Sequence, residues 1–340
     1  MKIVNSLLLL FTVALLSCNT GSNKEGGESG KIEDSKPDTI EILNDMIKEN
    51  PSDAELYIKK ARVLEKRNRP GEAIDETDRA LQADSTNPDI LAYRSKLFYD
   101  RKMIRESMEA AEKALEIDEN HVEANKRAAW IFLVLEDYEK AFTSVNKALK
   151  NDEYDAECYY IKGMAYKEQE KFKLAVSSFQ TAVEQDDDYY DAWVQLGMLH
   201  AAAGHDLAVK YYDNAIKADS GKYDARYNKA YYLQENIGDY RAALDEYDEL
   251  LRFNPNFYNS YFNKGYIYMQ YLNEYDSAQM MYSRVIDINP ASHRAYLNRG
   301  ISYEKAGDLQ RAIEDVNKAL KMKPDYDQAA RAKARITGKM

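Results

Sequence analysis

The chain has 340 residues, of which 45% are apolar and 31% are charged, and its formal net charge is −11. This apolar share is enough for a substantial core, so the composition excludes a wholly disordered protein. The 58 acidic side chains outnumber the 47 basic ones, which argues against nucleic acid or an anionic membrane surface as the main ligand. With two cysteines and four histidines, the chain can form neither a disulfide framework nor a structural zinc cluster.

An apolar stretch from Leu7 to Leu16 follows Lys2 near the N-terminus. It is about half as long as the roughly 20 residues that a membrane-spanning helix needs. A positive residue, a short apolar segment and a small-residue end are typical of a secretory signal peptide. We therefore predict that residues 1–17 are a signal peptide.

The end of this stretch, Leu15-Leu16-Ser17-Cys18, resembles the lipobox of bacterial lipoproteins. The resemblance implies that the peptide is cut before Cys18 and that Cys18 becomes the lipidated first residue. Acyl chains would then hold the protein to the membrane of the bacterial cell envelope. Asn19 stands where an aspartate would resemble the inner-membrane retention signal, so the resemblance favours the outer membrane, with the protein facing the periplasm. Ordinary secretion, with Cys18 incidental, is the alternative.

The stretch from Asn19 to Pro37 consists of Gly, Ser, Asn and charged residues with almost nothing apolar. This composition is typical of a flexible linker. As a random coil it would span about 24 Å, enough to hold a domain clear of lipid headgroups. Residues 18–37 are therefore expected to be the lipidated cysteine and its linker.

The rest of the chain repeats itself with a period close to 34 residues. In this register the eighth residue of each repeat is small, which predicts a pair of helices that approach to about 8–10 Å. The irregular spacings require one deletion near Asp206 and single insertions near Ile237 and Leu272. Repeats begin at Ala54, Pro88, Val122, Ala156, Tyr190, Tyr223, Tyr258 and His293. The small residues are Ala61, Ser95, Ala129, Gly163, Gly197, Ala230, Gly265 and Gly300.

Two repeats show most clearly which known family this pattern resembles. They contain Trp193-x-x-Leu196-Gly197 followed by Ala208-x-x-x-Tyr212, and Tyr296-x-x-x-Gly300-x-x-Tyr303 followed by Ala312 and Pro324. This order of large, small, aromatic, Ala and Pro residues resembles the tetratricopeptide repeat (TPR) family. Three positions depart from the pattern, namely Asn125, Arg226 and His200.

The resemblance implies an all-α fold, a right-handed α-solenoid of eight TPR helix-turn-helix repeats over residues 54–326. A leading helix is expected in residues 38–53, from Asp38 to Glu49. A closing helix is expected in residues 327–340, from Asp327 to Ile336, because the last repeat of a solenoid needs its apolar face covered.

Positions five, nine and twelve of each first helix form a face rotated by about 100° from the packing face. In the geometry of the family, this face points into a concave groove. From the third repeat onward it is mostly apolar or aromatic, and such side chains suit a protein or peptide ligand. The alternative is that packing between repeats uses these residues. The candidate binding residues are Trp130, Tyr160, Met164, Met198, Tyr227, Tyr231, Phe262, Tyr266, Met269 and Leu297.

The sequence shows no converging set of catalytic residues. His200 and His205 are five residues apart, so a continuous helix would not align them, and we expect a packed His200 and a His205 in a turn. Cys158 has no histidine near it in sequence, which favours core packing. We therefore predict no catalytic residue, no metal ligand and no cofactor.

These features together lead to one main hypothesis and two alternatives. The main hypothesis is a lipid-anchored periplasmic scaffold that captures envelope proteins in a concave aromatic groove without catalysis, and that contacts the membrane only through its lipid. One alternative is an envelope enzyme or metal-dependent hydrolase that uses His200 and His205. The other is a structural lipoprotein that self-associates through its tyrosines. Neither the partner nor its pathway follows from the residues.

Overall fold

The structure is a computed structural model that describes residues 38–340. The predicted signal peptide, Cys18 and the predicted linker therefore lie outside the described residues. Over the described range the chain forms eighteen α-helices and two π-helical turns and contains no strand. The predicted all-α fold is confirmed.

Helices α2 to α17 form eight consecutive pairs, each with a first and a second helix. The first helices are α2 (Ala54–Lys66), α4 (Pro88–Asp100), α6 (Val122–Val134), α8 (Ala156–Glu168), α10 (Tyr190–Ala202), α12 (Asp224–Tyr232), α14 (Tyr258–Ile267) and α16 (His293–Lys305). The second helices are α3 (Pro70–Ala83), α5 (Ile104–Ile117), α7 (Tyr138–Asn151), α9 (Phe172–Gln185), α11 (Leu207–Ala218), α13 (Tyr240–Phe253), α15 (Tyr275–Ile288) and α17 (Leu309–Met322). Seven of the eight first helices begin at the predicted residue, and α12 begins one residue later, at Asp224.

The small residue at position eight lies where the two helices of a pair meet. A Cβ atom added to Gly163 would lie 2.6 Å from the Phe179 ring, and one added to Gly197 would lie 2.5 Å from the Tyr212 ring. Ala61, with no exposed surface, occupies the same position in the first pair. The column of small residues therefore does what the sequence predicts, since it lets a large side chain of the second helix pack directly on the first.

Each pair is joined by a turn with one residue in the left-handed conformation. In the fourth pair this residue is Glu170, with a φ of 57°, and the turn closes with a hydrogen bond from Lys171 N–H to the carbonyl oxygen of Tyr166. Such a closure satisfies a carbonyl that the helix end would otherwise leave free. The left-handed residues are Asn68, Lys102, Glu136, Glu170, Gly204, Gly238, Asn273 and Gly307.

The two predicted insertions appear as π-helical turns at the ends of first helices. The turn η1 (Leu233–Ile237) extends α12, and η2 (Tyr268–Leu272) extends α14. In η1 the N–H of Gly238 donates to the carbonyl oxygen of Leu233, five residues earlier, at 2.8 Å. A π turn takes up one extra residue without breaking the helix, so these two pairs keep their packing despite the added length.

The predicted deletion shortens α11, the second helix of the fifth pair. This helix has 12 residues, whereas α9 before it and α13 after it have 14 each. The missing residue belongs to the first turn of the second helix, because Ala208 still fills its expected buried position. The loss falls beside the turn that carries His205.

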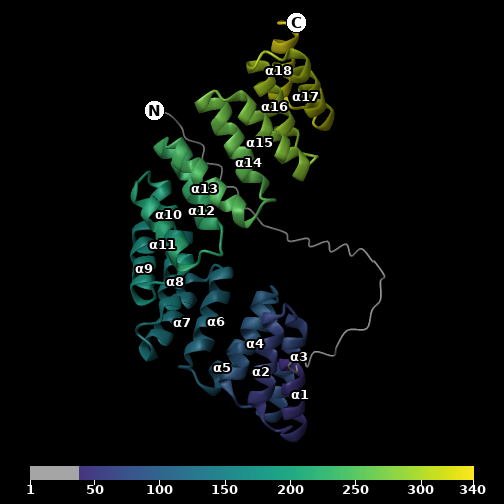
Figure 1. The fold of residues 1–340 in the computed structure, drawn as a ribbon. Coiled ribbons are helices and arrows are strands. Elements are labelled where there is room, and N and C mark those ends of the chain that lie inside the picture. The colour runs from purple at the N-terminus through teal and green to yellow at the C-terminus, as the bar shows by residue number, and fades with distance from the viewer. Residues whose placement is uncertain (1–37) are drawn as a thin grey trace, which may run out of the picture.

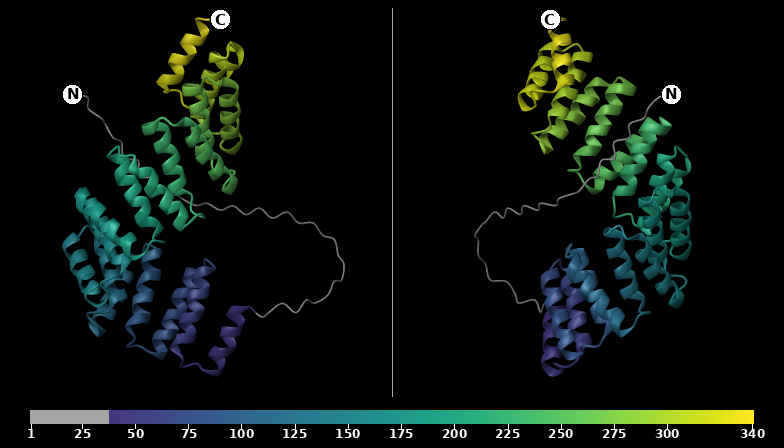
Figure 2. Two further views of the ribbon diagram at one scale, coloured as in Figure 1. Left: turned by 60° about the vertical axis from the view of Figure 1, so that its left-hand side comes forward. Right: turned by 180° about the vertical axis from the view of Figure 1, so that it is seen from behind.

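The pairs stack into an arc that runs from α1 to α18, with α8 to α10 in its middle (Figures 1 and 2). First helices of neighbouring pairs contact each other, for example α4 with α6 and α6 with α8. Contacts of similar extent are not found between second helices of the described pairs. The first helices are thus closer together, so they line the inner side of the arc.

Single helices cover both ends of the stack. The leading helix α1 (Thr39–Glu49) buries Leu43 against α2, and the closing helix α18 (Asp327–Thr337) buries Ile336 against the last pair. Glu304 of α16 is buried and accepts hydrogen bonds from Arg335 at 2.8 Å and from Lys339 at 2.7 Å. The predicted end helices are therefore present, and charged bonds reinforce the C-terminal one.

Candidate functional site

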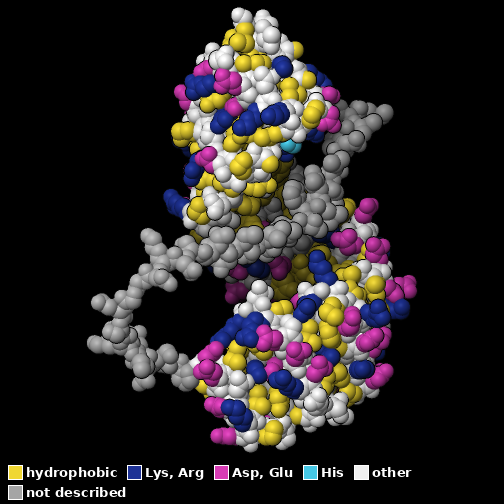
Figure 3. Space-filling model, turned by 90° about the vertical axis from the view of Figure 1, so that its right-hand side faces the viewer, with side chains coloured by type: hydrophobic (Ala, Val, Ile, Leu, Met, Phe, Trp, Pro, Cys, Tyr) yellow, Lys and Arg dark blue, Asp and Glu magenta, His cyan; other side chains and the backbone are white. Residues whose placement is uncertain are grey.

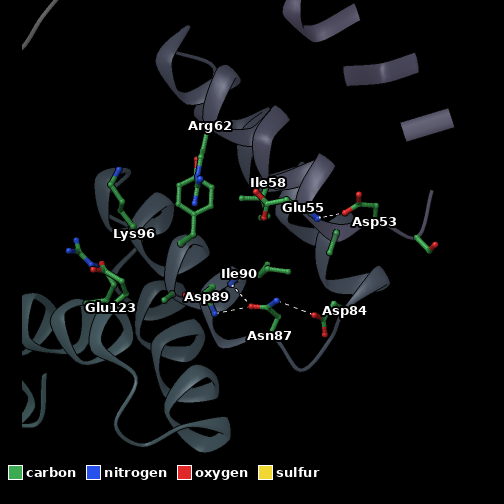
Figure 4. A pocket seen from close by; sticks show the side chains of 15 residues that line it. Asp53, Glu55, Ile58, Arg62, Asp84, Asn87, Asp89, Ile90, Lys96 and Glu123 are labelled. Atoms are coloured by element: carbon green, nitrogen blue, oxygen red, sulfur yellow. Dashed lines mark hydrogen bonds between the residues drawn. The ribbon is translucent and has the colours of Figure 1, made fainter. Parts of the chain in front are cut away.

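A cavity of about 700 Å³ lies on the inner side of the first three pairs, between α2, α4 and α6. Its wall combines apolar residues such as Ile58 and Ile90 with charged side chains (Figure 4). Arg62 and Lys96 lie on one side of this cavity, and Asp53 and Asp84 on the other. The charged lining residues are Asp53, Glu55, Arg62, Asp84, Asp89, Lys96, Glu123 and Arg127. We call this space the N-terminal groove.

The basic side of the N-terminal groove is built around Tyr93. The guanidinium of Arg62 lies 5.8 Å from the centre of the Tyr93 ring, and the Tyr93 hydroxyl donates to Glu65 at 2.8 Å. Lys96 bonds to Glu65 and, at 2.9 Å, to Asp100. Burial opposes ionisation of Glu65, but the hydrogen bonds from Lys96 and Tyr93 outweigh it and lower the pKa of Glu65. Lys96 is thus engaged within the chain, and the ring of Tyr93 holds Arg62 in place.

The acidic side follows the beginnings of the first helices. Asn87 caps α4 by accepting the N–H groups of Asp89 and Ile90, and Asp53 caps α2 by accepting the N–H of Glu55. Carboxylates near a helix N-terminus are favoured by the helix dipole. Part of the acidic lining therefore has a structural role, as the sequence pattern already suggests.

Two charged residues of the lining form no ion pair within the described chain. Among the described residues neither Glu55 nor Arg62 has an ion-pair partner, and both side chains are exposed. They are seven residues apart on α2, which is about 10 Å along the helix axis. The N-terminal groove therefore offers one negative and one positive group for an external ligand.

A buried charge cluster closes the N-terminal groove at the fourth pair. The ammonium of Lys126 lies 2.8 Å from Asp155 and 3.2 Å from Glu157, and its side chain is only 8% exposed. Burial works against the charged form, but the hydrogen bonds that Lys126 donates to Asp155 and Glu123 raise the pKa of Lys126. Glu157 also accepts the indole N–H of Trp130 at 2.8 Å. These contacts join α6 to α8 and hold the Trp130 ring in place.

Three predicted binding residues are wrong, because packing between repeats buries them. Tyr160 is 8% exposed and contacts Trp130, Phe179 and Tyr189, with ring centres 5.8, 5.4 and 5.1 Å away. Met269 and Leu297 are each 1% exposed. Their side chains fill the space between neighbouring helices and cannot present a surface to a partner.

The other seven predicted residues keep some exposed surface. Met198 and Tyr231 are 43% and 49% exposed and point away from the core. The remaining five are half-buried within the aromatic packing of the inner side, namely Trp130, Met164, Tyr227, Phe262 and Tyr266. Figure 3 faces the open side of the arc, where hydrophobic side chains gather in the hollow between the N-terminal and C-terminal parts.

The π turns expose apolar residues that the repeat pattern did not single out. Ile237 and Leu272 are 42% and 39% exposed, and Tyr271 is 37% exposed. The Tyr271 ring stacks on Tyr240, with centres 4.1 Å apart and planes 14° apart. The insertions themselves were visible as 35-residue spacings, but their geometry was not.

His200 and His205 are brought together by the turn between α10 and α11. Their Nδ1 atoms are 3.4 Å apart, and the His200 ring packs on Tyr211 with centres 4.9 Å apart. Burial and the neighbouring His205 lower the pKa of His200. As predicted, His200 is packed and His205 lies in the turn, and the two rings meet because the helix ends between them.

Cys158 is buried, as predicted, and burial raises the pKa of its thiol. Residues 38–340 hold no group of three or more His, Cys, Asp or Glu side chains suited to a metal ion. Within the same range, every helix is too short or too polar to cross a membrane.

Family models match most of the described chain. The tetratricopeptide repeat models match residues 202–256, 258–292 and 293–326. The chain contains tetratricopeptide repeats. A FAT domain model matches residues 39–204, where the helix pairs begin at a regular spacing of 34 residues. No curated protein matches the chain.

Solved structures show the same fold at low identity. The C-terminal part of a TPR repeat-containing protein from Cytophaga hutchinsonii is 16% identical, with a TM-score of 0.61, over 71% of this chain and 98% of that one. A structure of the APC/C hetero-tetramer Cut9–Hcn1 is 16% identical, with a TM-score of 0.52, over 87% of this chain and 58% of that one. MamA is 22% identical over 51% of this chain and 96% of its own, with a TM-score of 0.47.

Proposed function

We propose that this protein is a non-catalytic scaffold, held in the bacterial cell envelope by a lipid on Cys18, that binds a segment of a partner protein along its inner side. The observation that carries the proposal is the N-terminal groove, a cavity of about 700 Å³ with Glu55 and Arg62 free at its surface. TPR folds form protein-interaction scaffolds, and the TPR matches support this part of the proposal. The lipobox resemblance supports the anchor and a periplasmic place at the outer membrane.

The partner segment that fits this groove carries two opposite charges. An extended chain rises about 3.3 Å per residue, so a few residues span the roughly 10 Å between Glu55 and Arg62. A basic side chain would face Glu55 and an acidic one would face Arg62.

Exposed residues farther along the inner side extend this surface. Met198 and Tyr231 lie at corresponding positions of the fifth and sixth first helices. A methionine adapts to irregular surfaces, and a tyrosine offers a large contact area with little loss of side-chain freedom. We expect these two residues to add contact area and the charged groove to set which segment binds.

Photo-crosslinking in cells tests the proposal. A benzophenone amino acid would replace Glu55 or Tyr231 on first helices, and Leu174 or Met280 on second helices as matched controls. All four side chains are exposed. We expect a crosslinked partner from the inner positions and not from the controls, and mass spectrometry would then identify its segment. Equal products from both sides would contradict the proposal, and products between two copies of this chain would favour self-association.

The anchor needs a separate test. Replacing Cys18 by Ser should abolish labelling with a palmitate analogue and release the protein from the membrane fraction. Labelling that persists in this variant would contradict lipidation at Cys18.

A further inference from the structure

The turn after α10 has a geometry that brings two specific side chains together. The N–H of His205 donates to the carbonyl oxygen of His200 at 2.9 Å, and the N–H of Gly204 donates to that of Ala201 at 3.0 Å. Gly204 has a φ of 71°. These two hydrogen bonds place a residue of the last helical turn beside the residue that follows the connecting turn. In the fifth pair both of these residues are histidines.

Within residues 38–340, no other turn of this kind pairs two histidines. The same closing hydrogen bond, 2.9 Å long, occurs within the turns of the second, third and fourth pairs. The corresponding residues there are Phe98 and Met103, Phe132 and Asp137, and Tyr166 and Lys171. The backbone of the turn is thus common to the repeats, whereas the imidazole pair is particular to one of them.

The distance between the two rings is informative. His200 Nδ1 and His205 Nδ1 are 3.4 Å apart, which is longer than the 2.7–3.2 Å that is usual for a hydrogen bond from nitrogen. Two nitrogen ligands at about 2.0–2.1 Å from a tetrahedral metal ion are about 3.3–3.4 Å apart. The spacing therefore suits two ligands of one ion better than a direct hydrogen bond.

The surroundings leave the two rings available. No described carboxylate bonds to either imidazole, and the Nε2 atom of His200 is buried without a hydrogen-bond partner. His205 is exposed. Both rings line a cavity of about 450 Å³ whose wall is otherwise apolar except for Lys173, and includes Phe172, Val176 and Leu199. This space can take an ion together with water molecules or an incoming group.

The geometry points to a binding site for a first-row divalent transition metal such as Zn²⁺, with His200 Nδ1 and His205 Nδ1 as its two protein ligands. Imidazole nitrogen suits these metals, whereas Mg²⁺ and Ca²⁺ prefer oxygen. Only two ligands come from the described chain, so the other positions are open to water or to a side chain of a partner. The site is separate from the N-terminal groove, and it stands whether or not that groove binds protein.

Titration of the purified, untagged protein with Zn²⁺ by calorimetry tests the site. We expect one saturable site per chain, which His205→Ala weakens by at least about tenfold, since losing even an outer partner of a metal ligand typically costs 10–100-fold. His293→Ala is the matched control, because it removes a histidine from the eighth pair, and it should leave the affinity unchanged. Equal Zn²⁺ affinity in His205→Ala, or no saturable binding in the wild type, would overturn the proposal.

A second measurement identifies the ligand atoms without any substitution. Nitrogen-15 spectra of the imidazoles should show Zn²⁺-dependent shifts of Nδ1 in His200 and His205 together. Shifts confined to Nε2, or to His121 and His293, would contradict the assignment. Circular dichroism of His205→Ala should match the wild type, because His205 lies exposed in a turn.

Discussion

The first three helix pairs and the sixth and seventh pairs use the same fold for different inner surfaces. In the first three, charged side chains such as Arg62 and Glu55 leave a cavity of about 700 Å³. In the sixth and seventh, rings pack on one another, as when Tyr227 lies 6.1 Å from Tyr247 and Phe262 lies 5.5 Å from Tyr282. Small residues at the helix crossings determine the fold. The inner side can therefore hold a cavity or packed aromatic rings without any change in how the helix pairs stack.

The largest expected effect is a difference in unfolding free energy between a buried and an exposed tyrosine of the inner side. Tyr160→Ala should lower the free energy of unfolding by about 3–5 kcal/mol, because the removed ring packs against Trp130, Phe179 and Tyr189. Tyr231→Ala should change it by no more than about 0.5 kcal/mol, since that side chain is half exposed. Midpoints of urea unfolding measure both. Similar shifts for the two variants would contradict the assigned burial.

The charge cluster at the boundary of the N-terminal groove gives the next effect. Lys126→Ala should cost about 3 kcal/mol, because it leaves Asp155 without its buried counter-charge and Glu157 with Arg127 alone. Lys96→Ala should cost at most about 1 kcal/mol, since that ion pair is partly exposed. Thermal and urea unfolding of both variants would show the difference, and an equal loss would mean that Lys126 is not buried.

Acid should loosen the C-terminal end of the stack. The hydrogen bond from Arg335, with help from Lys339 and against the effect of burial, lowers the pKa of Glu304 in the folded protein. The resulting stabilisation is present at neutral pH and is lost as the pH falls below about 4.3, the ordinary glutamate value. The protection of α18 amides, measured against their intrinsic exchange rates, should therefore fall with acid in the wild type. In Glu304→Gln this protection should be lower at neutral pH and nearly independent of pH, and an unchanged acid response would contradict this role.

The smallest effect concerns the turns, which also differ along the chain. The first four use Asn, Lys or Glu in the left-handed conformation, whereas three of the last four use Gly. Glu136→Gly should raise the stability by up to about 1 kcal/mol, because a left-handed residue with a side chain is strained. Gly307→Ala should lower it by a similar amount. Thermal melting curves measure both changes, and a loss of stability in Glu136→Gly would show that its side chain has a further role.

The periodic residues predicted the fold well, since close helix packing requires small side chains at fixed positions. Gly163 against Phe179 shows this, because no larger residue fits there. The irregular spacings also located the π turns and the shortened α11. The exposure of Tyr271 did not follow, because it depends on the geometry of the π turn after α14 and on stacking with Tyr240.

The exposure of the inner face was predicted less well for a physical reason. A helical face that points inward also touches the next first helix. Sequence position alone does not say whether a side chain packs on that helix or stays exposed. Tyr160 is buried because Trp130 and Tyr189 lie beside it, whereas Tyr231 has no comparable cover. The charges of the first three repeats were visible in sequence, but their spacing did not show that they line one cavity. His205 was expected in a turn, but its contact with the His200 ring depends on how that turn closes.

The most direct test of the central claim is the affinity of the crosslinked partner segment for three proteins. Isothermal calorimetry would compare the wild type, Arg62→Ala in the N-terminal groove and Tyr231→Ala on the aromatic side. We predict that Arg62→Ala weakens binding by at least about fivefold, as expected for a residue that contributes more than 1 kcal/mol, and that Tyr231→Ala has the smaller effect. Binding to Arg62→Ala at wild-type strength would contradict the claim that the open, charged groove selects the partner.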